Sequence, residues 1–323
     1  MKYPNDFINQ IICGDCLTEH TKIKNGSVDL ILTDLPYGNM NGINNPQRPK
    51  SWGNPEYLKW DKALPINKIY EIANRILRKN GKMILFSQEP YTSKLITQVI
   101  ENLPFSYRMI WQKNDFANAL LCNKSPVSYF EDILVFSKKY DMEAIHPLRG
   151  YALEIKNLLP IKYSRKAFKE KFGHYGFNHF LECEEKNTQF NLCTEESYNQ
   201  LIKVFRIDKM EGFKNFEDLR VIDRKYDSTF NLWEGKKYKS NILKYKKDYK
   251  GYHPTQKPIL LLEDLIKTFS NKGDLVVDLT AGSGSTGVAC ANTNRNYILI
   301  EKEEKYIDIS RDRINAIPEL LFV

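Results

Sequence analysis

The sequence predicts an α/β fold in which a parallel sheet is interrupted by a mainly helical insertion. Short apolar runs alternate with helical patterns towards both ends of the chain, and this alternation is typical of parallel sheets. Between residues 141 and 250 the apolar runs stop and helical patterns dominate. The 323 residues are 42% hydrophobic and 27% charged, which supports a sizeable core and excludes a wholly disordered chain.

Five apolar runs in the first 140 residues predict buried strands. The helical pattern before the third run extends over Ile66–Arg78, and Asn80-Gly81 is a typical helix end. The five predicted strands are Gln10–Cys13, Val28–Thr33, Lys82–Ser87, Tyr107–Trp111 and Asp132–Phe136.

The insertion holds 22 basic and 17 acidic residues, so it carries about +5 of the chain's net charge of +8. This balance mildly favours a polyanionic partner. Thr194 precedes two glutamates, which favours a helix start there. The pattern Ser164–Phe172, then Gly173, then a second short helix would suit a helix-turn-helix, although such a glycine is usually only a helix C-cap.

The alternation of helices and strands resumes after residue 250. The segments expected there are a helix over Pro258–Phe269, a strand over Asp274–Asp278, a helix ending at Ala291, a strand over Asn296–Ile300 and a helix over Lys305–Ile314.

A glycine-rich turn, Gly282-Ser283-Gly284-Ser285-Thr286-Gly287, joins one of these strands to the next helix. Glycines there let the backbone approach a nucleotide, and Glu301, at the end of the following strand, can bind ribose hydroxyls. The spacing alone fits a nicotinamide or flavin cofactor equally well, or a tight turn that binds nothing. Asp278, directly before the turn, is unusual for those two cofactors.

A second string, Asp34-Leu35-Pro36-Tyr37, follows a strand at the edge of the sheet where α/β proteins bind ligands. An exocyclic amine on a base is a poor nucleophile because its lone pair is delocalised. The Asp34 carboxylate and the Leu35 carbonyl, extended by the following proline, could accept its two hydrogens and direct the lone pair. Tyr37 offers a ring for base stacking. An ordinary Asp-Pro turn remains the alternative.

The third string is Tyr252-His253-Pro254-Thr255-Gln256-Lys257-Pro258, in which Thr255 would suit a helix cap and Pro258 a first helical turn. Together the three strings resemble the β-class S-adenosylmethionine-dependent DNA amino-methyltransferases, which modify adenine N6 or cytosine N4, in their short phage or prophage form. The resemblance covers about residues 8–140 and 250–315. It extends to Trp60-Asp61 and to the stretches 110–113 and 131–138.

The resemblance implies a circularly permuted, seven-stranded Rossmann-like methyltransferase sheet with a mainly helical target-recognition insert. Residues 1–140 would form the catalytic half, 141–250 the insert and 251–323 the cofactor-binding half. The third strand of the cofactor half is missing after Ile314, so the N-terminal strand Gln10–Cys13 would supply it.

The resemblance also implies S-adenosylmethionine as cofactor and assigns roles to residues. Asp15 would contact the cofactor's adenine, Glu301 its ribose, and Asp278 with the glycine turn its methionine part. The full assignment to cofactor binding is Asp15, Asp34, His253, Thr255, Gln256, Lys257, Asp278, Ala281, Gly282, Gly284 and Glu301. The assignment to catalysis is Asp34, Leu35, Pro36 and Tyr37.

Two positions depart from the family pattern. Leu35 replaces the usual first proline, but the acceptor needed there is a backbone carbonyl, so the chemistry should survive. Phe130-Glu131 replaces a common His-Glu pair, which puts the role of the base-pocket wall in doubt. Aspartate rather than serine at position 34 favours adenine N6 over cytosine N4. The implied mechanism is direct methyl transfer to a base flipped out of double-stranded DNA at a specific short site.

A basic segment, Gly235–Lys250, carries seven lysines with tyrosines between them and is typical of phosphate contact, or else of a solvated loop. The residues assigned to DNA binding are Lys113, Arg165, Lys166, Lys236, Lys237, Lys239, Lys244 and Lys246.

Other function classes remain open at this point. A nicotinamide-dependent oxidoreductase would use the glycine turn but would leave the other two strings unexplained, and a silent DNA-binding protein would need a damaged site. Cys13 and Cys16 have the spacing of a metal or redox pair, but no second pair follows, so no metal is expected. The chain has no apolar run that would span a membrane, which predicts a cytoplasmic protein of a bacterial or phage-infected cell. A homodimer and a cognate restriction endonuclease are open.

Overall fold

The computed structural model describes residues 7–38, 62–117, 122–123, 126–142, 144–160, 162–248, 252 and 256–317. The chain separates into two compact units. Unit 1 comprises Met1–Leu77, Gly81–Lys138 and Thr229–Val323, and unit 2 comprises Arg78–Asn80 and Lys139–Ser228. The basic segment after Thr229 therefore groups with the sheet and not with the helical insertion. No helix in the described ranges is long and apolar enough to cross a membrane.

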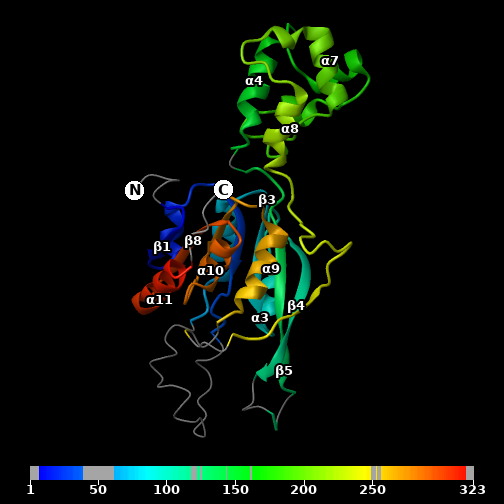
Figure 1. Cartoon of the computed structure of the whole chain (residues 1–323). Coiled ribbons are helices and arrows are strands. Elements are labelled where there is room, and N and C mark those ends of the chain that lie inside the picture. Colours follow the sequence, from blue (N-terminus) through cyan, green and yellow to red (C-terminus); the bar gives the residue numbers. More distant parts are fainter. Residues whose placement is uncertain are drawn as a thin grey trace. The chain divides into compact units, whose positions relative to one another are not determined.

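Unit 1 is built around an eight-stranded sheet in the order β1-β8-β7-β2-β3-β5-β4-β6 (Figure 1). The first five strands in this order run parallel, β5 is antiparallel to both of its neighbours, and β6 is parallel to β4. The predicted α/β sheet is confirmed, with one strand more than the seven expected. The strands are β1 Gln10–Cys13, β2 Val28–Thr33, β3 Leu77–Ser87, β4 Phe105–Ala117, β5 Ser128–Ser137, β6 Ile242–Lys244, β7 Leu275–Asp278 and β8 Asn296–Glu301.

The permuted strand order is confirmed by the register of the outer strands. Gln10 in β1 pairs with Ile298 in β8, and β8 pairs in turn with β7. Because β1, β8, β7 and β2 are parallel, their carboxyl ends meet at one edge of the sheet. The residues that end or follow these strands, Asp15, Glu301, Asp278 and Asp34, are thereby placed along that edge.

Alternate side chains of the sheet feed two separate cores. Ile31 in β2 packs in one core with α2 and α3, whereas Leu30 and Leu32 pack in the other with α9 and α10. This layering explains why strands of the centre read as continuous apolar runs. The helices of unit 1 are α1 Cys16–Glu19, the 3-10 turn η1 His20–Lys22, α2 Ile66–Ile76, α3 Tyr91–Thr97, α9 Ile259–Phe269, α10 Ser285–Asn292 and α11 Glu304–Asn315.

The predicted helix over 66–78 ends two residues early, and Asn80-Gly81 does not cap it. Leu77 takes an extended conformation and is fully buried, so β3 begins directly after α2. The pairing of β2 with β3 then jumps from Val28–Leu77 to Leu30–Lys82. Asn80, with a positive φ of 64°, therefore serves a bulge in the strand rather than a helix end.

Apart from Arg78–Asn80, which belong to β3, the regular elements among the described residues of unit 2 are all helical, and the unit has its own core, rich in phenylalanine. Thr194 caps its helix as predicted, accepting from the Ser197 amide. The helix-turn-helix prediction fails because the second helix is a single turn, Asn178–Leu181, with three of its four residues buried. The helices are α4 Leu148–Leu158, α5 Arg165–Phe172, α6 Asn178–Leu181, α7 Glu195–Phe205, the 3-10 turn η5 Ile207–Lys209 and α8 Phe216–Arg224.

Candidate active site

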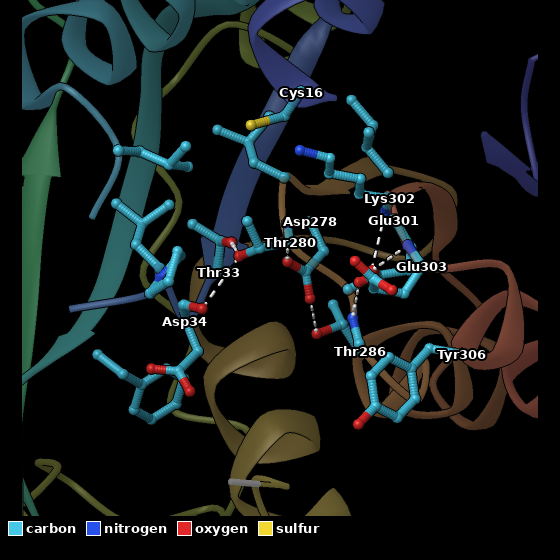
Figure 2. A pocket seen from close by; sticks show the side chains of 18 of the residues that line it. Cys16, Thr33, Asp34, Asp278, Thr280, Thr286, Glu301, Lys302, Glu303 and Tyr306 are labelled. Atoms are coloured by element: carbon cyan, nitrogen blue, oxygen red, sulfur yellow. Dashed lines mark hydrogen bonds between the residues drawn. The ribbon is translucent and has the colours of Figure 1, made fainter. Parts of the chain in front are cut away.

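A cavity of about 470 Å³ lies at the carboxyl edge of the parallel strands, within unit 1 (Figure 2). This is the edge at which open α/β sheets bind ligands. Of the residues assigned to catalysis or cofactor binding, the cavity wall includes Asp15, Asp34, Leu35, Pro36, Tyr37, Gln256, Lys257, Asp278, Ala281, Gly282 and Glu301. His253 and Thr255, like Trp60-Asp61, lie outside the described residues.

The glycine turn connects β7 to α10 at one side of the cavity. Gly282 and Gly284 have positive φ angles of 52° and 75°, which side chains rarely allow. A Cβ on Gly284 would also lie 2.6 Å from the Cβ of Ser310 in α11. Gly284 therefore has to be glycine for its conformation and for its close approach to α11, whereas its approach to a nucleotide stays a prediction.

Glu301 is held by backbone amides at this side of the cavity. Its carboxylate accepts from the amides of Gly282 (2.7 Å), Lys302 (2.8 Å) and Glu303 (2.9 Å), as Figure 2 shows. Burial raises the pKa of Glu301, and the three amide donors act against that rise. These bonds fix the orientation of the carboxylate at the end of β8.

Asp278 lies between the two sides of the cavity and is bonded to neutral donors (Figure 2). It accepts from the Thr286 hydroxyl at 2.6 Å and from the Thr280 amide at 3.1 Å. Burial raises the pKa of Asp278 to about 6. The Thr280 hydroxyl in turn bonds to Thr33 (2.9 Å) and donates to the backbone carbonyl of Asp34 (3.0 Å). Sequence reasoning missed Thr33 and Thr280, because a hydroxyl near the end of a strand belongs to no recognisable motif.

Asp34 is in contact with a hydroxyl and an ammonium group. The Tyr37 hydroxyl donates to Asp34 Oδ1 at 2.8 Å, and Lys257 Nζ donates to Oδ2 at 2.5 Å. Burial raises the pKa of Asp34, and the nearby Lys257 only partly opposes that rise. The Tyr37 ring lies 5.4 Å from the Tyr91 ring, centroid to centroid, so one neighbour of this ring is already an aromatic residue.

Lys257 lies beside Asp34 and also reaches Glu131, a residue that sequence reasoning left without a role. The Nζ of Lys257 is 3.2 Å from Glu131 Oε2, and Glu131 Oε1 is 2.5 Å from Lys113 Nζ. The sequence did contain a signal for Lys113 and Glu131. Every second residue of β4 from Met109 to Lys113 lies on the buried face of the strand, and Glu131 lies on the same face of β5 as Ile133.

Asp15 and Gln256 complete the wall. Asp15 caps α1 by accepting from the Leu17 amide at 2.9 Å, which leaves its second oxygen towards Lys302, whose Nζ is 4.0 Å away. The Ser283 hydroxyl donates to Gln256 at 3.4 Å.

The residues assigned to DNA binding fall into two groups. Lys113 is buried against Glu131. The Lys239 side chain is 7% exposed and pairs with the buried Asp264. Both lysines were predicted to contact DNA, but in this structure neither ammonium group is available to a phosphate. Arg165 pairs with Glu182. Exposed lysines remain at Lys166, Lys236, Lys237, Lys244 and Lys246.

Comparison with known proteins places this geometry in a family. Residues 28–312 match the N6/N4 methyltransferase family, described as DNA methylase. The DNA adenine methyltransferase YhdJ of Escherichia coli (strain K12) is 25% identical over 319 residues, which cover 97% of this chain and 86% of that protein. The type II methyltransferase M.HinfI of Haemophilus influenzae is 25% identical over 331 residues, covering 97% and 70%.

A solved structure shares the fold. The PvuII DNA methyltransferase, described as cytosine-N4-specific, aligns with a TM-score of 0.50 at 14% identity, covering 94% of this chain and 85% of that one. The methyl donor of the family is S-adenosylmethionine, and the cavity fits it chemically, because carboxylates line a space beside a nucleotide-type glycine turn. The chain belongs to the N6/N4 family of DNA methylases.

Proposed function

We propose that this protein methylates the exocyclic N6 of adenine in a base flipped out of double-stranded DNA, at a specific short site and by direct transfer. The observation that supports it most is the placement of Asp34 and Leu35 at the cavity edge, where a carboxylate and a backbone carbonyl follow β2 directly. Such a pair of acceptors suits the two hydrogens of a base amine. YhdJ, which is named an adenine methyltransferase, supports the choice of base.

The cofactor's sulfonium supplies an electrophilic methyl group, and this chain's residues orient its acceptor. Asp34 and the Leu35 carbonyl would accept the amine's hydrogens and direct the nitrogen lone pair. The nitrogen would take the methyl group, the sulfonium would leave as a neutral thioether, and the methylated amine would release its extra proton to water. Orientation of this kind accounts for much of the acceleration in such reactions.

We assign each part of the cofactor to the hydrogen-bonding groups that line the cavity. Asp15 would bind the adenine, Glu301 the ribose, and Asp278 with the backbone of Gly282 and Gly284 the methionine part. The division into a catalytic half (1–140), a target-recognition insert (141–250) and a cofactor half (251–323) is part of the same proposal. So is a cytoplasmic location in a bacterial or phage-infected cell.

Nucleoside mass spectrometry tests the choice of base. The protein is incubated with mixed-sequence DNAs and S-adenosylmethionine that carries a deuterated methyl group. Labelled N6-methyladenine is the expected product. Labelled N4-methylcytosine would overturn the choice of base while keeping the amine as acceptor. Absence of label from every DNA would favour the silent DNA-binding alternative. Membership of the methylase family leaves the oxidoreductase alternative without support.

A further inference from the structure

Four charged side chains form a continuous buried chain that ends at the cavity. Lys113 contacts Glu131, Glu131 contacts Lys257, and Lys257 contacts Asp34, with nitrogen–oxygen distances of 2.5, 3.2 and 2.5 Å. The exposed fractions of these side chains are 2%, 12%, 9% and 22%, in the order Lys113, Glu131, Lys257, Asp34. Two cations balance two anions, which is the condition under which charges tolerate burial.

One oxygen in this group of four side chains lacks a well-aligned hydrogen bond. Glu131 Oε2 is buried and accepts no such bond from the described residues, although Lys257 Nζ lies 3.2 Å away. The other oxygen, Oε1, is held by Lys113. A buried acceptor without a hydrogen bond is costly, so its position beside an ammonium with three donors calls for an explanation.

Asp34 presents the complementary problem. Both of its oxygens already accept a bond, Oδ1 from Tyr37 and Oδ2 from Lys257. An incoming base amine needs an acceptor there, and an ammonium group, which only donates, cannot provide one. Each carboxylate oxygen has a second lone pair, so the amine can approach Asp34, but at Oδ2 it competes with the Lys257 ammonium group. The same ammonium group faces Glu131 Oε2.

We propose that Lys257 is a positioning residue that moves from Asp34 to Glu131 when the target amine arrives, with Lys113 holding Glu131 in place to receive it. This inference rests on the proposed methylation of a base amine. Before the base enters, Lys257 lowers the pKa of the partly buried Asp34 and orients its carboxylate. After the move, the Lys257 ammonium bonds Glu131 Oε2, and Asp34 Oδ2 is free to accept from the amine. The ammonium stays paired with a carboxylate in both states, so the exchange avoids leaving a buried charge alone.

A double-mutant cycle on single-turnover methyl transfer tests the exchange. Glu131→Gln should slow transfer by about 10- to 100-fold, because Lys257 then remains on Asp34 and the amine is misplaced. In a Lys257→Met background the same substitution should change the plateau rate by less than about two-fold, because above the acidic limb Glu131 affects the amine's position only through Lys257. An equal loss in both backgrounds, or no loss in either, would overturn the proposal.

The pH profile separates this role from damage to the site. Glu131 raises the pKa of Asp34, so Glu131→Gln should move the acidic limb of the rate profile to lower pH while the plateau falls. Lys257→Met should move that limb to higher pH. A slowed Glu131→Gln enzyme whose acidic limb is unmoved or moves upward would contradict the exchange.

Matched variants control for folding and for the substitution itself. Glu89→Gln changes an exposed carboxylate at the end of β3 and should leave the rate within about two-fold of the original. Thermal unfolding reports whether each variant folds. Should Lys257→Met not fold, Lys257→Arg replaces it: a guanidinium binds a carboxylate through two parallel bonds, so its release from Asp34 should slow transfer by about ten-fold. Transfer by Lys257→Arg at the original rate would overturn the proposal.

Label is counted in both N6-methyladenine and N4-methylcytosine. A cytosine product would therefore end the adenine assignment without affecting this test, since either base presents an amine to Asp34.

Discussion

The two ends of the cavity hold their carboxylates in opposite ways. Asp34 is bonded to a lysine ammonium and a tyrosine hydroxyl, both carried on side chains that can rotate. Glu301 is bonded to three backbone amides, which cannot leave without unfolding the turn. The difference indicates that the Glu301 end is rigid before any ligand binds, whereas the Asp34 end can exchange partners. Rigidity suits recognition of a constant cofactor, and exchange suits a reacting base.

The contrast between the two ends is tested most strongly by a substitution that changes only the Asp34 end. Asp34→Ala should lower single-turnover methyl transfer by about 10³-fold, since the amine loses a charged acceptor. Asp34 is also assigned to cofactor binding, so calorimetry should show weaker S-adenosylhomocysteine binding, but by only about ten-fold or less, because the opposite end of the cavity is untouched.

The control for this variant is Asp34→Asn, which keeps one acceptor oxygen and should retain more activity than alanine. Methyl transfer by Asp34→Ala at a rate near the original would remove Asp34 from the reaction.

The pH dependence of stability should reveal the carboxylate between the two ends. Burial raises the pKa of Asp278 from 3.8 to about 6. A carboxyl that holds its proton more tightly when folded makes the free energy of unfolding fall as pH rises between these values, by about 3 kcal/mol in total. Above about pH 6 the whole cost is present, and below about pH 4 it is absent.

Asp278→Asn lacks this titration. The free energy of unfolding of the variant minus that of the original should therefore rise by about 3 kcal/mol as the pH is raised from about 4 to about 7. Urea unfolding at both pH values measures the difference. A difference that is constant with pH would show that Asp278 titrates normally.

The smallest expected effect is on cofactor-product binding at the Glu301 end. Glu301→Gln replaces one acceptor oxygen by a donor that faces backbone amides, and should weaken S-adenosylhomocysteine binding by about ten-fold. Glu304→Gln, an exposed position in α11 three residues later, is the matched control and should bind normally. Calorimetry on both variants makes the comparison, and equal affinities would exclude Glu301 from cofactor binding.

Structural features that depend on residues close together in the sequence were predictable. The strand at Val28–Thr33, the glycine turn and the permuted place of Gln10–Cys13 follow from local patterns and strand order, and the structure confirms them. The end of α2 was not predictable in this way, because Asn80-Gly81 suits a bulge as well as a helix end, and only the pairing of Leu77 with Val28 decides.

The ion pairs of the site were harder to predict for a physical reason. Asp34, the neighbouring strands that carry Lys113 and Glu131, and Lys257 come from three separate parts of the chain. A lysine in a polar sequence is typical of an exposed position until its buried partner is known. Lys113 and Lys239 were both predicted to contact DNA for this reason, and both are buried against carboxylates.

The pairing of β1 with β8 also sets the order of events during synthesis. Gln10 has its partner at Ile298, so β1 leaves the ribosome long before the strand with which it pairs. At ordinary translation rates the wait is roughly 15 to 60 s. Asp15 and Glu301 meet only then, so the methyl donor can stabilise the nascent chain only after β8 has been made. Until that point β1 presents unpaired backbone groups to proteases and chaperones.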